Sequence, residues 1–305
     1  MGLIPGKDFN MNEKIKAMRA EWAEGDAKRD AGITIPDDVT RYTDISYGPH
    51  TDHILDIYCP KGTDKPLPTI ISIHGGGWFY GSKETYQHYC MALARRGFTV
   101  VNFNYRLAPE YPYPAPLEDC CTLLSWVQQQ ADTYFIDRNN LFTVGDSAGG
   151  QIAFQLLTML TNPKYAALFS FAPPADVKIR ACGMNCGCYF IPFNRFITPQ
   201  KMGAIFEAYF PGDYMALVPQ LKAQKYLTRD FPPAFVMTGR YDYLKFMAAP
   251  LHLLLRLKGV ESKLRIYGKK DQKEIGHVFH LNCRLELADE CNDAQCAFFR
   301  KHIQN

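Results

Sequence analysis

Residues 140–154 read "NLFTVGDSAGGQIAF" and join an apolar run to an amphipathic run through a turn of small residues. The first part is typical of a buried strand and the part after Ser147 of a helix, which places the serine in a G-x-S-x-G turn between the two. A serine in so sharp a turn is forced into a strained backbone conformation, so its neighbours must be small. Its hydroxyl then lies beside a helix N-terminus, where free N–H groups favour negative charge. The stretch predicts an α/β fold with a nucleophilic serine, Ser147. The alternative is a glycine-rich turn without chemistry, because the five-residue pattern also occurs by chance.

Eight short β-rich runs are spaced along the chain, at 42–47, 53–58, 69–74, 98–104, 141–145, 166–171, 234–238 and 263–267. The later runs are almost continuously apolar and alternate with helical segments at 83–96, 117–131, 148–160 and 244–258. Strands that are buried on both faces and separated by helices form a mostly parallel sheet covered on each side. The first two runs are polar at alternate positions and indicate an antiparallel edge. We therefore expect an eight-stranded, mostly parallel sheet with helices on both faces.

Two segments fall outside this alternation. Residues 1–40 form an N-terminal segment with helical spacing at 11–31, and residues 41–305 form the main domain. Within that domain, the block at about 175–230 adds no obvious strand, and we expect it to be an insertion over the sheet with a helix at 199–209. We expect the aromatic residues of this insertion to pack in the core in preference to lining a pocket, because aromatic side chains bury readily. These residues are Tyr189, Phe190, Phe193, Phe196, Phe206 and Tyr209.

The composition excludes several classes of function. The net charge of +3 comes from 34 basic and 31 acidic residues that are intermixed along the chain, so we expect no nucleic-acid partner. The sequence shows no secretion signal and no long apolar run, which predicts a cytoplasmic protein without a membrane partner. Ten cysteines in such a protein are expected to be reduced thiols. Cys182, Cys186 and Cys188 cluster, but without a fourth ligand we predict no metal.

A second glycine cluster, "HGGGW" at 74–78, follows a buried strand. Acyl transfer needs preorganised N–H donors for an oxyanion, and consecutive glycines can turn their amides toward one. We predict that Gly75 and Gly76 supply two donors and Ala148 the third. His74 is expected to fix the loop by a hydrogen bond. A phosphate loop is the alternative, but no Lys-Ser or Lys-Thr follows.

A serine hydroxyl needs a base to remove its proton. His277 follows the last expected strand in "EIGHVFH", where a late residue can return to the carboxyl edge of the sheet. His280 is the second candidate, although a role in packing against the C-terminal helix is favoured for it.

The carboxylate that orients the base should also follow a strand. Asp242 stands four residues beyond Thr238 in "AFVMTGRYDYLK", and a helix cap is its alternative role. Asp271 and Glu274 are nearer to His277 in sequence, but they lie in the charged run "GKKDQKE" and are expected to be solvated.

The chain order Ser147, Asp242, His277 is that of α/β-hydrolases. Together, "HGGGW", "NYRLAPE", "GDSAGG", "GRYDYL" and "GHVFH" resemble the hormone-sensitive lipase-like carboxylesterases from about residue 41 to the end of the sequence. The resemblance implies an α/β-hydrolase core, a helical cap from the N-terminal helices and an insertion after the sixth strand, no cofactor, and hydrolysis of short-acyl esters. By position, the catalytic triad and oxyanion donors of the family fall on Ser147, Asp242, His277, Gly75, Gly76 and Ala148.

The sequence departs from the family in two places. The frequent "DxLxD" reads Asp242-Tyr243-Leu244-Lys245-Phe246 here, and "ACGMNCGCYFIPFNRF" at 181–196 matches no consensus, which leaves the substrate open. In "NYRLAPE", Arg106 and Glu110 are expected to hold the loop.

Rival functions stay open at this level. An amidase, lactonase or peptidase would use the same nucleophile, and a catalytically inactive ligand-binding relative would keep the fold. The expected partner is a small ester substrate, and an exposed edge strand could also pair two copies into a homodimer.

Overall fold

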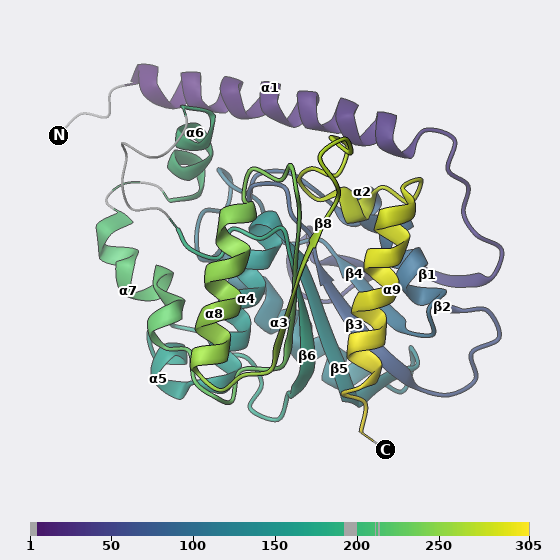
Figure 1. Ribbon diagram of the computed structural model, residues 1–305. Helices are drawn as coiled ribbons and strands as arrows, with labels where there is room; N and C mark the ends of the chain where they lie inside the picture. The colour runs from purple at the N-terminus through teal and green to yellow at the C-terminus, as the bar shows by residue number, and fades with distance from the viewer. Residues whose placement is uncertain (1–4, 192–199, 211, 213, 305) are drawn as a thin grey trace.

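In a computed structural model, which describes residues 5–191, 200–210, 212 and 214–304, eight strands of the described chain form one sheet (Figure 1). Their order across the sheet is β1-β2-β4-β3-β5-β6-β7-β8. The strands are β1 Val39–Ser46, β2 Ile54–Pro60, β3 Leu67–Ile73, β4 Thr99–Phe103, β5 Ile136–Asp146, β6 Ile179–Asn185, β7 Ala234–Gly239 and β8 Ser262–Tyr267.

The sheet is antiparallel at one edge and parallel elsewhere. β2 runs antiparallel to both β1 and β4, whereas all pairs from β4 to β8 are parallel. The half-exposed β1 forms the edge, while every residue of β4 is buried. The predicted mostly parallel sheet with an antiparallel edge is therefore confirmed.

Helices cover both faces of this sheet. Val100 packs in a core with α2 and α9, while its neighbour Val101 packs in the opposite core with α3, α4 and α8, because successive side chains of a strand point to opposite faces. The helices are α1 Pro5–Asp30, α2 Lys83–Ala94, α3 Ala115–Gln130, α4 Ser147–Thr161, α5 Pro163–Ala166, α6 Gln200–Tyr209, α7 Val218–Leu221, α8 Ala248–Leu257 and α9 Glu286–Arg300, with short 3₁₀ turns η1 Tyr214–Leu217, η2 Ala223–Lys225, η3 Lys245–Met247 and η4 Phe279–Leu281. None of the helices in the described ranges combines the length and apolarity needed to cross a bilayer.

The sixth strand lies elsewhere than predicted. The expected strand at 166–171 is wrong, because the side chain of Asn162 accepts a hydrogen bond from the Lys164 N–H and begins the one-turn helix α5 instead. β6 comes from the stretch assigned to the insertion at about 175–230, so the segment between β6 and β7 starts only after Asn185. Gly183 in β6 lets α9 approach closely, since a Cβ there would lie 2.6 Å from Gln295 Nε2.

The N-terminal helix predicted at 11–31 is confirmed and starts earlier, at Pro5. Figure 1 shows α1 across one end of the sheet, beside α6. Trp22 packs on Phe79 with ring centroids 4.7 Å apart, and Arg19 donates to the Phe79 carbonyl at 2.8 Å, so α1 docks on the loop after β3. The division into a cap and a catalytic domain stays a prediction.

The described aromatic residues of the insertion pack mainly inside the molecule. The ring of Tyr209 stacks on Trp78 with centroids 4.8 Å apart, and Tyr189 is buried. Phe193 and Phe196 lie outside the described residues.

Candidate active site

Ser147 stands at the junction of β5 and α4. Its φ is +51°, in the left-handed region that a residue with a Cβ rarely adopts. The surrounding glycines permit this turn: a Cβ on Gly145 would lie 2.5 Å from the Gly149 carbonyl oxygen, and one on Gly149 would lie 2.1 Å from the Ile73 oxygen. The predicted strain at Ser147 and the predicted need for small neighbours are both confirmed.

The structure brings His277 and Asp242 to this serine. His277, in the loop after β8, has its Nε2 3.0 Å from Ser147 Oγ. Its Nδ1 lies 2.7 Å from Oδ1 of Asp242, which follows β7. The three side chains therefore form one hydrogen-bonded chain, as the sequence predicted, although they are separated by up to 130 positions.

The surroundings of Asp242 keep it ionised. Burial alone would raise its pKa, but the hydrogen bond and charge of His277, the Leu244 N–H and the Thr238 hydroxyl together hold that pKa below its ordinary value. An ionised carboxylate accepts the Nδ1–H of His277, which leaves the Nε2 lone pair facing the Ser147 hydroxyl. His277 can then accept the serine proton.

The other two histidines considered above take structural roles. His280 is fully buried against the edge of Tyr89, and burial lowers its pKa to about 3. His74 lies 2.7 Å through Nδ1 from the Gly75 carbonyl oxygen, so its predicted role in fixing the loop is confirmed. Asp271 and Glu274 are exposed, as expected.

One predicted oxyanion donor is already engaged. The Gly75 N–H donates to the hydroxyl of Tyr86 at 2.8 Å, so the prediction of Gly75 as a free donor is wrong. Among the described residues, the N–H groups of Gly76 and Gly77 have no hydrogen-bond partner, and the Ala148 N–H belongs to the first turn of α4, where the N–H groups of a helix lack intrahelical acceptors. Gly76 and Gly77 both have positive φ, +106° and +58°, which glycine adopts without strain.

Tyr86 and Asp146 were not predicted as site residues. The Tyr86 hydroxyl donates at 2.7 Å to Oδ2 of Asp146, the residue before Ser147, while accepting from Gly75. Both side chains are buried, and burial raises the pKa of Asp146 to about 7 against the opposing hydrogen bond from Tyr86. The two hydrogen bonds of the Tyr86 hydroxyl therefore connect the glycine loop to the turn that carries Ser147. No sequence signal marks Tyr86, because its role depends on where α2 packs.

A cavity of about 320 Å³ opens at these groups and is lined by Ser147, His277 and Gly76. Trp22 and Asp26 of α1 line it as well, so the N-terminal helix contributes to its wall. The volume lies at the lower end of the ~300–1,000 Å³ found for small-molecule sites.

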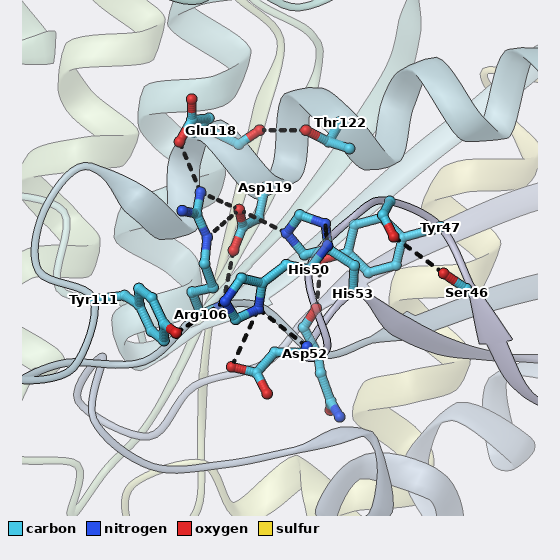
Figure 2. A network of polar contacts seen from close by, with 12 residues as sticks. Ser46, Tyr47, His50, Asp52, His53, Arg106, Tyr111, Glu118, Asp119 and Thr122 are labelled. Atoms are coloured by element: carbon cyan, nitrogen blue, oxygen red, sulfur yellow. Dashed lines mark hydrogen bonds and ion pairs between the residues drawn. The ribbon is translucent and has the colours of Figure 1, made fainter.

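Arg106 anchors a polar network away from this cavity (Figure 2). Its guanidinium lies 2.6 Å from Asp119 Oδ1 and 2.7 Å from Glu118, while Glu110 pairs instead with Arg19 of α1 at 2.6 Å. Arg106 and Glu110 thus hold the "NYRLAPE" loop as predicted, each through a different partner.

The cysteines provide one further polar group at the site. All ten are free thiols. Of the predicted cluster, Cys186 offers a sulfur atom within 4.8 Å of ligand atoms on Asp242 and His277. These are three groups that a metal ion could use, although His277 and Asp242 are already hydrogen-bonded to each other.

Comparison with known proteins yields relatives along most of the chain. A family model described as an alpha/beta hydrolase fold matches residues 70–281. The carboxylesterase NlhH of Mycobacterium tuberculosis is 30% identical over 241 residues, which cover 72% of this chain and 70% of the relative. An arylesterase of Saccharolobus solfataricus is 32% identical over 198 residues, covering 63% of this chain and 62% of the relative.

Solved structures share the fold over nearly the whole length. Esterase B from Lactobacillus rhamnosis superposes with a TM-score of 0.88 at 24% identity and covers 97% of this chain and 96% of its own. An esterase of Pyrobaculum calidifontis gives 0.75 at 23% identity, with 94% and 93% covered. The expected fold is confirmed.

Proposed function

We propose that this chain cleaves short-acyl esters through Ser147, His277 and Asp242. The chain belongs to the alpha/beta hydrolase fold family and, within it, to the hormone-sensitive lipase-like hydrolases of carboxylic esters. The observation that carries the proposal is the hydrogen-bonded chain from Ser147 Oγ through His277 to Asp242, which lies at the wall of a cavity.

In the first half-reaction, Ser147 Oγ attacks the ester carbonyl while His277 Nε2 takes its proton. Asp242 holds the imidazole in the Nδ1–H tautomer and stabilises the imidazolium that forms. The proton then passes from His277 to the departing alcohol, and an acyl-enzyme is left on Ser147. Water deprotonated by His277 hydrolyses this ester, and the proton returns to Oγ.

The tetrahedral intermediates carry negative charge on the former carbonyl oxygen. We assign the stabilising donors to the N–H groups of Gly76, Gly77 and Ala148, because Gly75 donates to Tyr86. One preorganised donor of this kind lowers a barrier by about 3 kcal/mol. Tyr86 holds the glycine loop in position beside Ser147, because its hydroxyl is bonded both to Gly75 in that loop and to Asp146, the residue before Ser147.

The size of the cavity favours small substrates. About 320 Å³ accommodates a short acyl group together with a small alcohol. The solved esterase B is described as inhibited by a tributyrin phosphonate, and a short-acyl substrate for this chain agrees with that inhibitor.

The proposal is tested by comparing the wild-type protein with Ser147→Ala on p-nitrophenyl esters of increasing acyl length. We expect Ser147→Ala to lose at least ~10⁴-fold in kcat while melting at an unchanged temperature, and wild-type kcat/KM to fall for long acyl chains. Turnover by Ser147→Ala at the wild-type rate would refute the assignment of the nucleophile. A wild-type protein that binds esters without cleaving them would indicate a ligand-binding relative instead.

A further inference from the structure

One face of α1 contributes an acid and an aromatic ring to the catalytic cavity. Trp22, Asp26 and Arg29 follow the spacing of a helix face, so they lie on the same side of α1, and all three line the cavity at Ser147. The ring of Trp22 packs close to perpendicular to that of Tyr80, which also lines the cavity, with centroids 5.8 Å apart. This part of the wall therefore combines aromatic surface with an ion pair.

The Asp26 carboxylate is held in place from two sides. Its Oδ1 accepts a hydrogen bond from the Arg29 guanidinium at 2.8 Å, and its Oδ2 accepts one from the Tyr80 hydroxyl at 2.8 Å. A carboxylate accepts up to about four hydrogen bonds, so the described residues use about half of the acceptor capacity of Asp26. Its side chain is 28% exposed. Asp26 is therefore a fixed acceptor with lone pairs free for a ligand.

Arg29 offers a ligand much less. One of its N–H groups donates to Asp26, two donate to Asp30 and one donates to the Thr85 carbonyl oxygen, which leaves about one of the five in a guanidinium. Its single positive charge is paired with both carboxylates, so the three side chains together carry a net negative charge. Asp146, which also lines the cavity, adds to this charge when it is ionised. A ligand at this wall therefore meets acceptors and a negative potential.

We propose that Asp26 is a specificity-determining residue, which selects esters that carry a protonated amino group. The inference rests on the proposed function, since it names a substrate class for the same site. The ammonium N–H donates to the free lone pairs of Asp26, and the rings of Trp22 and Tyr80 add attraction for a positive charge. A carboxylate in the same place would be repelled, with about one N–H of Arg29 left to bind it.

This selection has a kinetic signature. Acetates of different alcohols form the same acetyl-enzyme, so they share one deacylation step. Differences between them in kcat/KM therefore report binding of the alcohol portion and acylation. One hydrogen bond to a charged group corresponds to a gain of about 10-fold.

The test compares three acetates whose alcohols have the same spacer. They are 3-(dimethylamino)propyl acetate, which is cationic near neutral pH, its neutral isostere 4-methylpentyl acetate, and the anionic 4-acetoxybutanoate. Release of acetic acid measures kcat/KM for each ester. We expect the wild-type protein to prefer the cationic ester to the neutral one by about 10-fold and to cleave the anionic ester most slowly.

Asp26→Asn should bring the ratio of kcat/KM for the cationic and neutral esters close to one, because the amide carries no charge. Glu24→Gln is the matched control. It removes the same charge from the same helix, but Glu24 is 69% exposed, pairs with Lys28 and does not line the cavity, so the ratio should stay at the wild-type value. Because each ratio is taken within one variant, a general loss of activity or stability does not alter it.

Two results would overturn the role of Asp26. One is equal kcat/KM for the cationic and neutral esters in the wild-type protein. The other is a wild-type ratio in Asp26→Asn, which would assign the preference to another group such as Asp146. Failure of the proposed function is distinguishable from both, because the wild-type protein would then hydrolyse neither p-nitrophenyl acetate nor any of the three acetates.

Discussion

Among the described residues, two buried aspartates are each paired with a histidine, and one of these two pairs faces a nucleophile. His277 and Asp242 lie 2.7 Å apart at the cavity, with Ser147 on the free nitrogen of the imidazole. His53 and Asp119, which are both buried, lie 3.0 Å apart in the polar network of Figure 2. Both carboxylates have pKa values below the ordinary one.

The partners of each carboxylate explain the difference. Asp119 accepts two further side-chain bonds from the Arg106 guanidinium, so its charge is neutralised by a permanent cation. Asp242 is bonded instead to His277, the Leu244 N–H and the Thr238 hydroxyl, none of which is a permanent cation, and its counter-charge forms only when His277 takes a proton. In this molecule, the pair balanced by a permanent cation is structural, and the pair whose histidine supplies the cation transiently is suited to catalysis.

The largest effect is expected when the two histidines are exchanged for glutamine one at a time. His277→Gln should lower kcat by roughly 10⁴-fold or more, because Ser147 loses its base. His53→Gln should keep kcat within about twofold and lower only the melting temperature. Steady-state kinetics below the melting temperature of both variants measures the contrast, and an equal loss of kcat in both would erase the distinction.

The matched change at the carboxylates is expected to be the next largest. Asp242→Asn should lower kcat by about 10⁴-fold, since an amide can hold the imidazole in the wrong tautomer. Asp119→Asn should leave kcat close to the wild-type value. If Asp242→Asn retains most of its activity, Asp242 does not set the tautomer that His277 needs for catalysis.

Tyr86 offers a smaller and more specific test. Tyr86→Phe should lower kcat by about 10-fold, because the Gly75 N–H and the Asp146 carboxylate both lose a partner and the oxyanion loop loses its register. Tyr58→Phe is the control, because it removes an equally buried hydroxyl that donates to Asp56 at 2.8 Å in the other part of the sheet. Equal kcat values in the two variants would contradict the positioning role of Tyr86.

Asp119 should affect stability and not rate. Its folded pKa lies below the ordinary value of 3.8, because the hydrogen bonds of His53 and Arg106 outweigh burial. The stabilisation is therefore complete above that value and is lost as the pH falls through the folded pKa.

Asp119→Asn should accordingly lower the free energy of unfolding by about 3 kcal/mol near neutral pH, and the difference from wild type should shrink below about pH 4. Urea titrations at both pH values measure it. Asp132→Asn, at an exposed ion pair with Arg138, is the control and should change the free energy by less than about 1 kcal/mol. If the loss of unfolding free energy in Asp119→Asn grew as the pH fell, the lowered pKa inferred for Asp119 would be contradicted.

The sequence predicted features that follow from local pattern. The strand-turn-helix around Ser147, the antiparallel edge and the positions of Asp242 and His277 after strands are of this kind. The exception was β6, whose residues "IRACGMN" lack the β-branched and aromatic pattern of a strand. Gly183 there is required by the close approach of Gln295, a contact between elements that periodicity cannot reveal.

The oxyanion loop shows the same limit within the site. "HGGGW" identified the loop, but which amides stay free depends on the hydroxyl of Tyr86, presented by α2. Likewise, the spacing of α1 predicted a helix but not that Trp22 would line the cavity. Local chemistry is therefore readable from the sequence, whereas the choice between equivalent neighbours depends on tertiary packing.

The central claim is that His277, and not His53, makes Ser147 nucleophilic. Labelling with a fluorophosphonate probe, followed by peptide mapping, tests it most directly. We predict one probe per chain on Ser147 in the wild-type protein and in His53→Gln at similar rates, and labelling slower by at least ~10³-fold in His277→Gln. Labelling of another residue in the wild-type protein, or equally slow labelling in both glutamine variants, would contradict the claim.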